Sequence, residues 1–148
     1  MKQSNTEKSY KRLKDALTAF RKEHTLKKLI FLDKEWSYYS CGKGKDCIII
    51  LPGGLGTGEV AFCYIQGLER CHRVISPIYP PANNIWELVE GLNRIIERES
   101  AENITFFGVS FGGILAQCYM QRYSERIRNL VLAHTTTITD QCATEEFE

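Results

Sequence analysis

The pattern of hydrophobic and polar positions changes its period near residue 26. In residues 7–24 apolar side chains recur at helical spacing between basic ones, which predicts an amphipathic helix. After this helix, short aliphatic stretches alternate with further helical patterns. Strands are predicted at 28–32, 36–40, 47–51, 72–78, 103–109 and 127–133, and further helices at 57–69, 85–99 and 111–123.

This order of elements predicts the fold class. The continuous aliphatic run 47–51 is typical of a strand buried on both faces. A hairpin with its turn at 33–35, followed by alternating strands and helices, predicts an α/β protein with a mostly parallel sheet covered by helices. Asn84 is expected to cap the helix that follows it, with Glu87 completing a capping box.

Composition narrows the function classes. The chain has 148 residues and a formal net charge of +1, which fits one domain and argues against a nucleic-acid binder. No apolar stretch approaches the roughly 18 residues of a spanning helix. The first twenty residues lack the apolar core of a secretory signal peptide. We therefore expect a soluble, cytoplasmic protein with no transmembrane segment and no nucleic-acid partner.

The six cysteines are expected to be free thiols. They form no C-x-x-C pair, and no histidine lies at zinc-finger spacing from them, so the local spacing predicts no metal site and no cofactor. Three disulfides remain the alternative, although disulfide scaffolds are usually chains that lack a core. Cys47, Cys63 and Cys118 lie in apolar runs and are predicted to be small buried hydrophobes.

The sharpest chemical signal is the segment 108–112, Gly-Val-Ser-Phe-Gly. It fits the G-x-S-x-G pattern, with an aliphatic strand before it and a helix directly after it. Such a turn forces the serine into strained backbone geometry, and glycines on both sides remove the crowding that side chains would cause. Ser110 is then exposed at the start of a helix whose amides favour negative charge, and is the candidate catalytic nucleophile.

A second glycine-rich segment, 52–58, follows the first parallel strand. The backbone N–H groups of Gly54 and Phe111 are the candidate oxyanion donors, because an acyl-transfer site of this architecture takes one donor from each position. A phosphate cradle is disfavoured, since the segment has neither G-K-[ST] nor G-x-G-x-x-G. A plain tight turn without function remains the alternative.

The three histidines limit how complete the site is. His24 lies on the first helix and His72 starts a strand, at the end of the sheet away from the candidate site. His134 follows the last strand and is expected to line the pocket rather than act as the base. Asp140, further on, is a weaker candidate for a triad acid.

From these motifs the chain resembles the α/β-hydrolase family over about residues 26–137, and within it the maspardin-like branch. The stretches that match this branch are 20–21, 26–30, 72–75, 79–80, 107–113 and 115–117. The resemblance implies that Ser110 takes the nucleophile position and that Gly54 and Phe111 take the oxyanion positions. Two features depart from the family pattern: Pro52-Gly53 replaces its common His-Gly pair, and nothing matches the triad histidine.

The resemblance also implies an incomplete fold, with about six of eight strands. We expect residues 1–25 to form a basic helix, 26–137 to form the N-terminal part of the core, and 138–148 to be a tail or the start of a cap. The first hypothesis is a serine hydrolase acting on small-molecule ester or acyl substrates in its complete form. The second is a non-catalytic, maspardin-like binding or regulatory protein that keeps the hydrolase fold and binds a protein partner, with the basic helix as the candidate docking surface. An open sheet edge would also permit oligomers.

Overall fold

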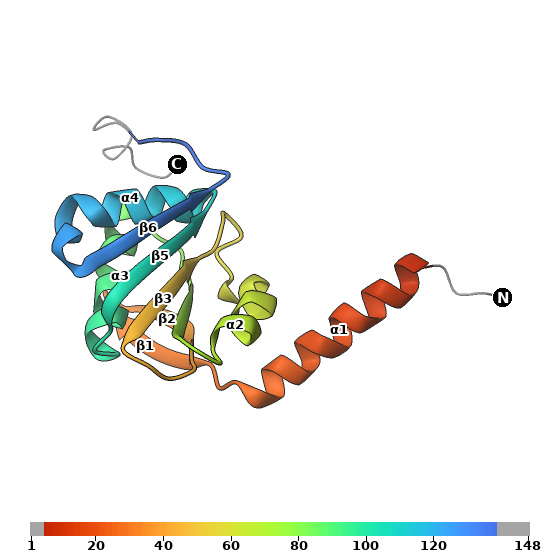
Figure 1. The fold of residues 1–148 in the computed structure, drawn as a ribbon. Helices are drawn as coiled ribbons and strands as arrows, with labels where there is room; N and C mark the ends of the chain where they lie inside the picture. Colours follow the sequence, from red (N-terminus) through yellow and green to blue (C-terminus); the bar gives the residue numbers. More distant parts are fainter. Residues whose placement is uncertain (1–4, 139–148) are drawn as a thin grey trace.

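The computed structural model of the chain describes residues 5–138 (Figure 1). Its helices are α1 (Asn5–Glu23), α2 (Phe62–Leu68), α3 (Ile85–Arg98) and α4 (Phe111–Tyr123), with short 3₁₀ helices η1 (Gly58–Ala61) and η2 (Ser124–Arg126). Its strands are β1 (Lys27–Phe31), β2 (Lys34–Cys41), β3 (Asp46–Leu51), β4 (Arg73–Ile78), β5 (Glu102–Val109) and β6 (Ile127–Ala133).

The six strands form one sheet in the order β1-β2-β4-β3-β5-β6. The β1–β2 and β2–β4 pairs are antiparallel, whereas β3 pairs in parallel with β4 and β5, and β5 pairs in parallel with β6. The aliphatic run of β3 lies inside this sheet, and Ile49 and Leu51 are fully buried, as a strand covered on both faces requires. The predicted α/β fold with a mostly parallel sheet is confirmed.

Helices cover the two faces of the sheet unequally. Helices α3 and α4 pack on one face, and α2 with the last turns of α1 packs on the other (Figure 1). The first face holds the larger core, which includes Leu92 and Phe106. The second holds a smaller core around Phe20 and Ile65. Along β6, by contrast, Leu130, Val131 and Leu132 remain 36%, 44% and 42% exposed.

Helix α1 extends away from the rest of the chain (Figure 1). Only its final turns are packed: Phe20 is fully buried, with its ring against those of Tyr39 and Phe62. Tyr10 and Leu13 are 69% and 54% exposed, although they lie at helical spacing from Phe20. The amphipathic pattern therefore predicts the helix, but the helix does not lie along the domain over its whole length. None of the helices in residues 5–138 is long and apolar enough to span a membrane.

Two local predictions are corrected. The hairpin turn lies at Leu32-Asp33 rather than 33–35, because both residues have positive φ (49° and 56°) and form the two-residue turn that matches strand twist. The helix predicted at 57–69 divides into η1 and α2. Gly58 lies so close to β4 that a Cβ would be 2.6 Å from the Ser76 carbonyl oxygen, and its own carbonyl accepts the Ser76 hydroxyl.

The cysteine predictions hold in part. Cys41, Cys47, Cys63, Cys71 and Cys118 are free, and Cys142 lies outside the described residues. Cys47 and Cys118 are buried as expected, but Cys63 is exposed, because its neighbour Phe62 and Ile65 form the buried side of α2.

The N-cap of α3 is confirmed. The Asn84 side chain accepts the Glu87 N–H at 3.1 Å. The Glu87 carboxylate accepts the N–H of Asn83 at 3.2 Å instead of the Asn84 N–H that the predicted capping box requires, and it is also paired with Lys34 from β2. These hydrogen bonds, from Lys34 first and then from Asn83, lower the pKa of Glu87 to about 2.

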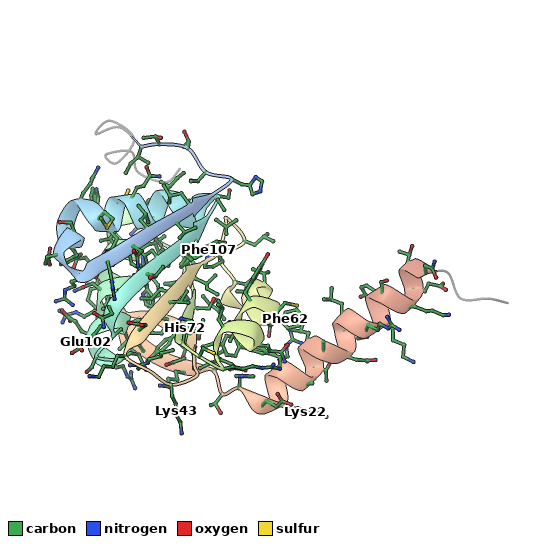
Figure 2. All side chains as sticks on the ribbon, in the orientation of Figure 1. Lys22, Lys43, Phe62, His72, Glu102 and Phe107 are labelled. Carbon is green, nitrogen blue, oxygen red and sulfur yellow. The ribbon has the colours of Figure 1, made fainter. Side chains whose placement is uncertain are left out.

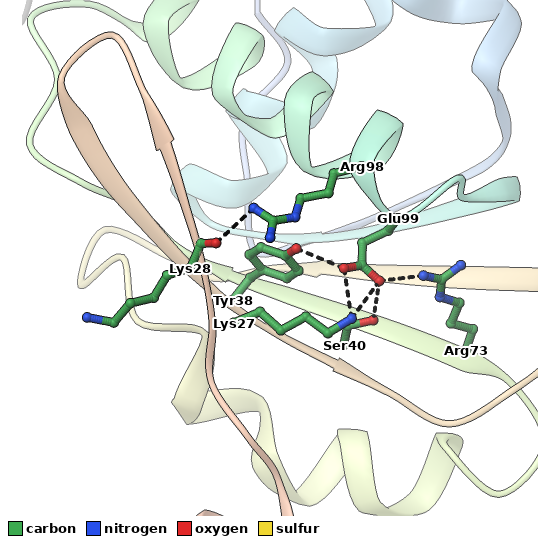
Figure 3. A network of polar contacts seen from close by, with 7 residues as sticks. All are labelled: Lys27, Lys28, Tyr38, Ser40, Arg73, Arg98 and Glu99. Atoms are coloured by element: carbon green, nitrogen blue, oxygen red, sulfur yellow. Dashed lines mark hydrogen bonds and ion pairs between the residues drawn. The ribbon is translucent and has the colours of Figure 1, made fainter.

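A buried carboxylate joins the C-terminal end of α3 to the sheet (Figure 3). The Glu99 side chain, 6% exposed, accepts hydrogen bonds from four side chains: Lys27 (2.8 Å), Tyr38 (2.8 Å), Ser40 (2.8 Å) and Arg73 (2.5 Å). Burial opposes ionisation, but the hydrogen bonds outweigh it and lower the pKa of Glu99 to about 2. Because this carboxylate binds β1, β2 and β4 at once, it fixes the antiparallel part of the sheet against α3.

Candidate functional site

Ser110 is the single residue between β5 and α4, at the carboxyl end of an interior strand of the sheet. Its φ of 52° and ψ of −120° are strained for a residue with a side chain, and it is exposed. Hydrogen bonds fix the Ser110 backbone on both sides. Its N–H donates to the Ala133 carbonyl at 3.0 Å, and its own carbonyl accepts the N–H of Gly113 at 2.9 Å and the hydroxyl of Thr135 at 2.8 Å. The predicted strand–turn–helix geometry, with a strained backbone at the serine, is confirmed.

The glycines near Ser110 are required because a side chain at their positions would clash with neighbouring atoms. A Cβ on Gly108 would lie 2.7 Å from the Gly112 carbonyl oxygen, and one on Gly112 would lie 2.1 Å from the Leu51 carbonyl oxygen. A Cβ on Gly113 would lie 2.6 Å from Thr135 Oγ1. The G-x-S-x-G pattern is thus the consequence of α4 beginning directly against the ends of β3 and β5.

The loop after β3 runs past this serine. A Cβ on Gly53 would lie 3.5 Å from the Ser110 Cβ, so these two residues are neighbours. The loop turns at once, with the Gly56 N–H donating to the Gly53 carbonyl at 2.8 Å. Gly54 is exposed at that turn, with no atom within 4 Å of the position its Cβ would take. Gly54 and Phe111 remain the candidate oxyanion donors.

Tyr79 supports the loop, and sequence analysis did not single it out. Its hydroxyl donates to the Pro52 carbonyl at 3.2 Å, and its N–H donates to the Gly56 carbonyl at 2.8 Å. Its ring packs edge-on against Phe111, with centroids 6.0 Å apart. Burial raises its pKa well above the ordinary value, so the hydroxyl stays a neutral donor. The available signals were its position directly after the strand predicted at 72–78 and its place in the matching stretch 79–80.

The histidines lie where the strand order predicts. His134 follows β6 with φ of 49°, is exposed, and lines a pocket of about 390 Å³ that Gly53 and Val109 also line. His72, labelled in Figure 2, instead lines a second pocket together with Asp46, at the amino ends of the parallel strands. Asp140 lies outside the described residues. In residues 5–138 no side chain forms a hydrogen bond with Ser110 Oγ.

One cluster of ligand-type side chains lies away from this edge. His24, Cys41 and Glu69 offer ligand atoms that all lie within 4.8 Å of one another. The prediction of no metal site rests on local spacing, which does not detect three residues brought together from distant parts of the chain.

The comparisons with known proteins agree with this geometry. A family model described as alpha/beta hydrolase fold matches residues 46–146. Maspardin from Danio rerio is 35% identical over 128 residues, and the match covers 81% of this chain and 41% of that protein. Maspardin from Homo sapiens is 33% identical over 128 residues, and that match covers 81% of this chain and 42% of that protein. The expected similarity to maspardins is confirmed, and the chain spans less than half the length of these relatives.

Solved structures carry the same arrangement of elements. Carboxylesterase CesB from Bacillus subtilis superposes with a TM-score of 0.68 at 18% identity, covering 83% of this chain and 47% of that chain. At this identity the likeness concerns the fold alone. The sheet order, the turn at Ser110 and the matched family model lead to one conclusion: the chain belongs to the α/β-hydrolase fold family.

Proposed function

We propose that Ser110 is the nucleophile of a serine hydrolase that cleaves small-molecule esters or related acyl compounds, and that this chain is the N-terminal part of that enzyme. The observation that carries the proposal is the backbone of Ser110, exposed at positive φ between a central strand and a helix N-terminus. Such strain costs about 1–3 kcal/mol, persists where the surrounding structure enforces it, and clusters at active sites. The coverage of less than half of the maspardins supports the second part of the proposal.

The reaction assigned to these residues is acyl transfer in two halves. Ser110 Oγ attacks the acyl carbon while its proton passes to a general base, and the carbonyl oxygen becomes an oxyanion. The Phe111 and Gly54 N–H groups donate to that oxyanion, each worth about 3 kcal/mol of barrier. The intermediate expels the alcohol, which takes the proton from the base, and water then hydrolyses the acyl-serine by the same route.

The base in this proposal is a histidine outside the chain. His134 lies at the same sheet edge, but it is exposed after β6 and forms no hydrogen bond with Ser110. We assign His134 to the pocket wall, where Gly53 and Val109 also lie. Tyr79 acts as a positioning residue. Its hydroxyl donates to the Pro52 carbonyl, near the donor Gly54, and its ring packs on Phe111, which supplies the other donor.

The test uses the protein expressed from its complete gene, assayed with p-nitrophenyl esters of increasing acyl length. Ser110→Ala is expected to lower kcat/KM by roughly 10³-fold or more, as loss of a nucleophile does in intact triads. The matched control is Ser124→Ala, which changes an exposed serine of η2 and should leave the rate within twofold. A folded complete protein whose hydrolysis is unchanged by Ser110→Ala would refute the assignment.

A second candidate function is binding without catalysis. Two observations favour it: Ser110 Oγ has no side-chain hydrogen bond within residues 5–138, and the basic helix α1 exposes Tyr10 and Leu13. In that case the strained turn would be kept because α4 must begin there. Absence of any ester hydrolysis by the folded complete protein would support this candidate over the first.

A further inference from the structure

Three side chains converge where α1, β2 and α2 end. His24 follows the last residue of α1, Cys41 is the last residue of β2, and Glu69 follows α2. Their nitrogen, sulfur and oxygen atoms all lie within 4.8 Å of one another. Around a tetrahedral Zn²⁺ ion, bond lengths of 2.0–2.3 Å separate such atoms by roughly 3.3–3.6 Å. Small side-chain movements therefore bring the three atoms to coordinating distances.

The hydrogen bonds of His24 prepare it as a ligand. Its Nδ1 lies 2.9 Å from the Phe20 carbonyl oxygen, an acceptor only, so Nδ1 carries the proton. The ring also stacks on Phe20, with centroids 4.2 Å apart. Metal-binding histidines commonly donate their second ring nitrogen to a backbone carbonyl in this way, which fixes the ring and presents the other nitrogen to the metal. Here Nε2 faces a Glu69 carboxylate oxygen at 2.8 Å.

Cys41 is fixed by the close approach of the next residue to the other ligand segment. Gly42, with φ of 71°, lies so near the 69–72 backbone that a Cβ would be 2.6 Å from the Glu69 carbonyl oxygen. The thiol is buried on one side of the cluster, whereas the side chains of His24 and Glu69 are 12% and 22% exposed and leave a path for an ion. Burial first, then the Glu69 charge, raise the pKa of Cys41 to about 12, so without a metal the sulfur is a neutral thiol.

We propose that His24, Cys41 and Glu69 bind one Zn²⁺ ion, with solvent as the fourth ligand. A thiolate, an imidazole and a carboxylate suit zinc, whereas magnesium and calcium take oxygen ligands. Binding releases two protons to solvent, that of the Cys41 thiol and the one that His24 Nε2 donates to Glu69, and the two anionic ligands then balance the charge of the ion. Lys27, a cation near Cys41, does not compete with zinc for these ligands, because the Glu99 carboxylate accepts its hydrogen bonds.

The consequence of zinc binding is a fixed first helix. Helix α1 contacts the remainder of the chain through few residues, of which only Phe20 is buried. A metal that joins His24 to β2 and α2 would tie the helix base to both elements. The site is therefore a structural clamp, distant from the chemistry proposed for Ser110, and it does not depend on that function.

The experiment is a Co²⁺ titration of the reduced, chelator-treated 148-residue chain, followed by displacement with Zn²⁺. One equivalent of Co²⁺ is expected to produce a thiolate-to-cobalt charge-transfer band and the strong visible bands of tetrahedral cobalt. Cys41→Ser should abolish the charge-transfer band, and Glu69→Gln should weaken binding at least tenfold. Zn²⁺ should raise the midpoint of thermal unfolding of the unmodified chain and leave that of His24→Gln unchanged.

The matched controls are Cys63→Ser and Cys71→Ser, which change exposed thiols and should keep both the band and the affinity. A folded unmodified chain that gives no charge-transfer band overturns the proposal and leaves His24 and Glu69 as an ion pair. A band that survives Cys41→Ser, or that is lost in either control, also overturns it. If Cys41→Ser fails to fold, the affinities of Glu69→Gln and His24→Gln decide the question.

Discussion

Gly112 and Leu51 belong to different elements and lie 61 positions apart in the sequence, yet a Cβ on Gly112 would lie 2.1 Å from the Leu51 carbonyl oxygen. The first turn of α4 therefore rests directly on the end of β3, and this contact holds Ser110 beside the glycine-rich loop. The arrangement of the candidate site depends on the absence of a side chain at position 112.

Gly112→Ala is expected to destabilise the chain by about 2–3 kcal/mol, because the backbone of β3 cannot yield to a new methyl group without shifting. The matched control is Gly67→Ala, also within a helix but with no atom within 4 Å of its Cβ position. That change should be neutral or stabilise by up to ~1 kcal/mol. Urea unfolding of both variants measures the difference, and equal midpoints would show that the contact is not tight.

Glu99→Gln tests the buried carboxylate. Removing the charge leaves Lys27 and Arg73 without their partner, and the expected loss is about 3 kcal/mol. The exposed Glu102→Gln is the control and should change stability by less than about 0.5 kcal/mol. Chemical unfolding at neutral pH compares the two variants, and a Glu99→Gln variant as stable as the control would contradict the assigned role.

The same carboxylate predicts a pH dependence. The pKa of Glu99 is lowered in the folded chain to about 2, from an ordinary value of 4.5. A group with a depressed pKa contributes its full stability above the unfolded value and loses it as the pH falls toward the folded one. Between pH 5 and about pH 2, the unmodified chain should therefore lose stability more steeply than Glu99→Gln. Parallel pH profiles for the two proteins would contradict this.

The sequence predicts the elements of this fold better than their arrangement. The helix 111–123 and the strand 127–133 have the predicted bounds. The spacing of apolar residues along a segment reflects which of its side chains are buried, so it can be recognised within the segment itself. The placement of β4 between β2 and β3 has no local signal, since strand order depends on long-range pairing. Ser110 could be predicted because its strain requires glycines nearby in the chain.

Tyr79 and Glu99 were not predictable in the same way. Each acts through partners that lie far away in the sequence, Pro52 for the tyrosine and Lys27, Tyr38, Ser40 and Arg73 for the glutamate. Nothing in the local sequence distinguishes Glu99 from other charged residues at helix ends. The His24–Cys41–Glu69 cluster escapes spacing rules for the same reason.

The exposed apolar residues of β6 predict self-association. This edge strand leaves Leu130, Val131 and Leu132 at least 36% exposed, and exposed apolar edges pair with other chains. Light scattering of the 148-residue chain should show oligomers, and Val131→Lys should reduce their mass. Leu55→Lys, which changes an 88% exposed loop residue, is the control. A monomeric unmodified chain would contradict the prediction.

The 148-residue chain itself should be a poor esterase. Because no described side chain forms a hydrogen bond with Ser110 Oγ, Ser110→Ala should change its hydrolysis of an activated aryl ester by less than threefold. His134→Ala should have an equally small effect. Robust turnover that both substitutions abolish would instead identify His134 as the base, and robust turnover that only Ser110→Ala abolishes would indicate that two chains pair to complete the fold.

The most direct test of the central claim is covalent labelling of Ser110 in the protein expressed from its complete gene. A fluorophosphonate reacts with a serine that a base activates, and tryptic mass spectrometry locates the adduct. We predict one adduct per chain, on the peptide that contains Ser110, and its loss in Ser110→Ala but not in Ser124→Ala. A folded complete protein that takes up no label, or takes it up elsewhere, would contradict the assignment of Ser110 as the nucleophile.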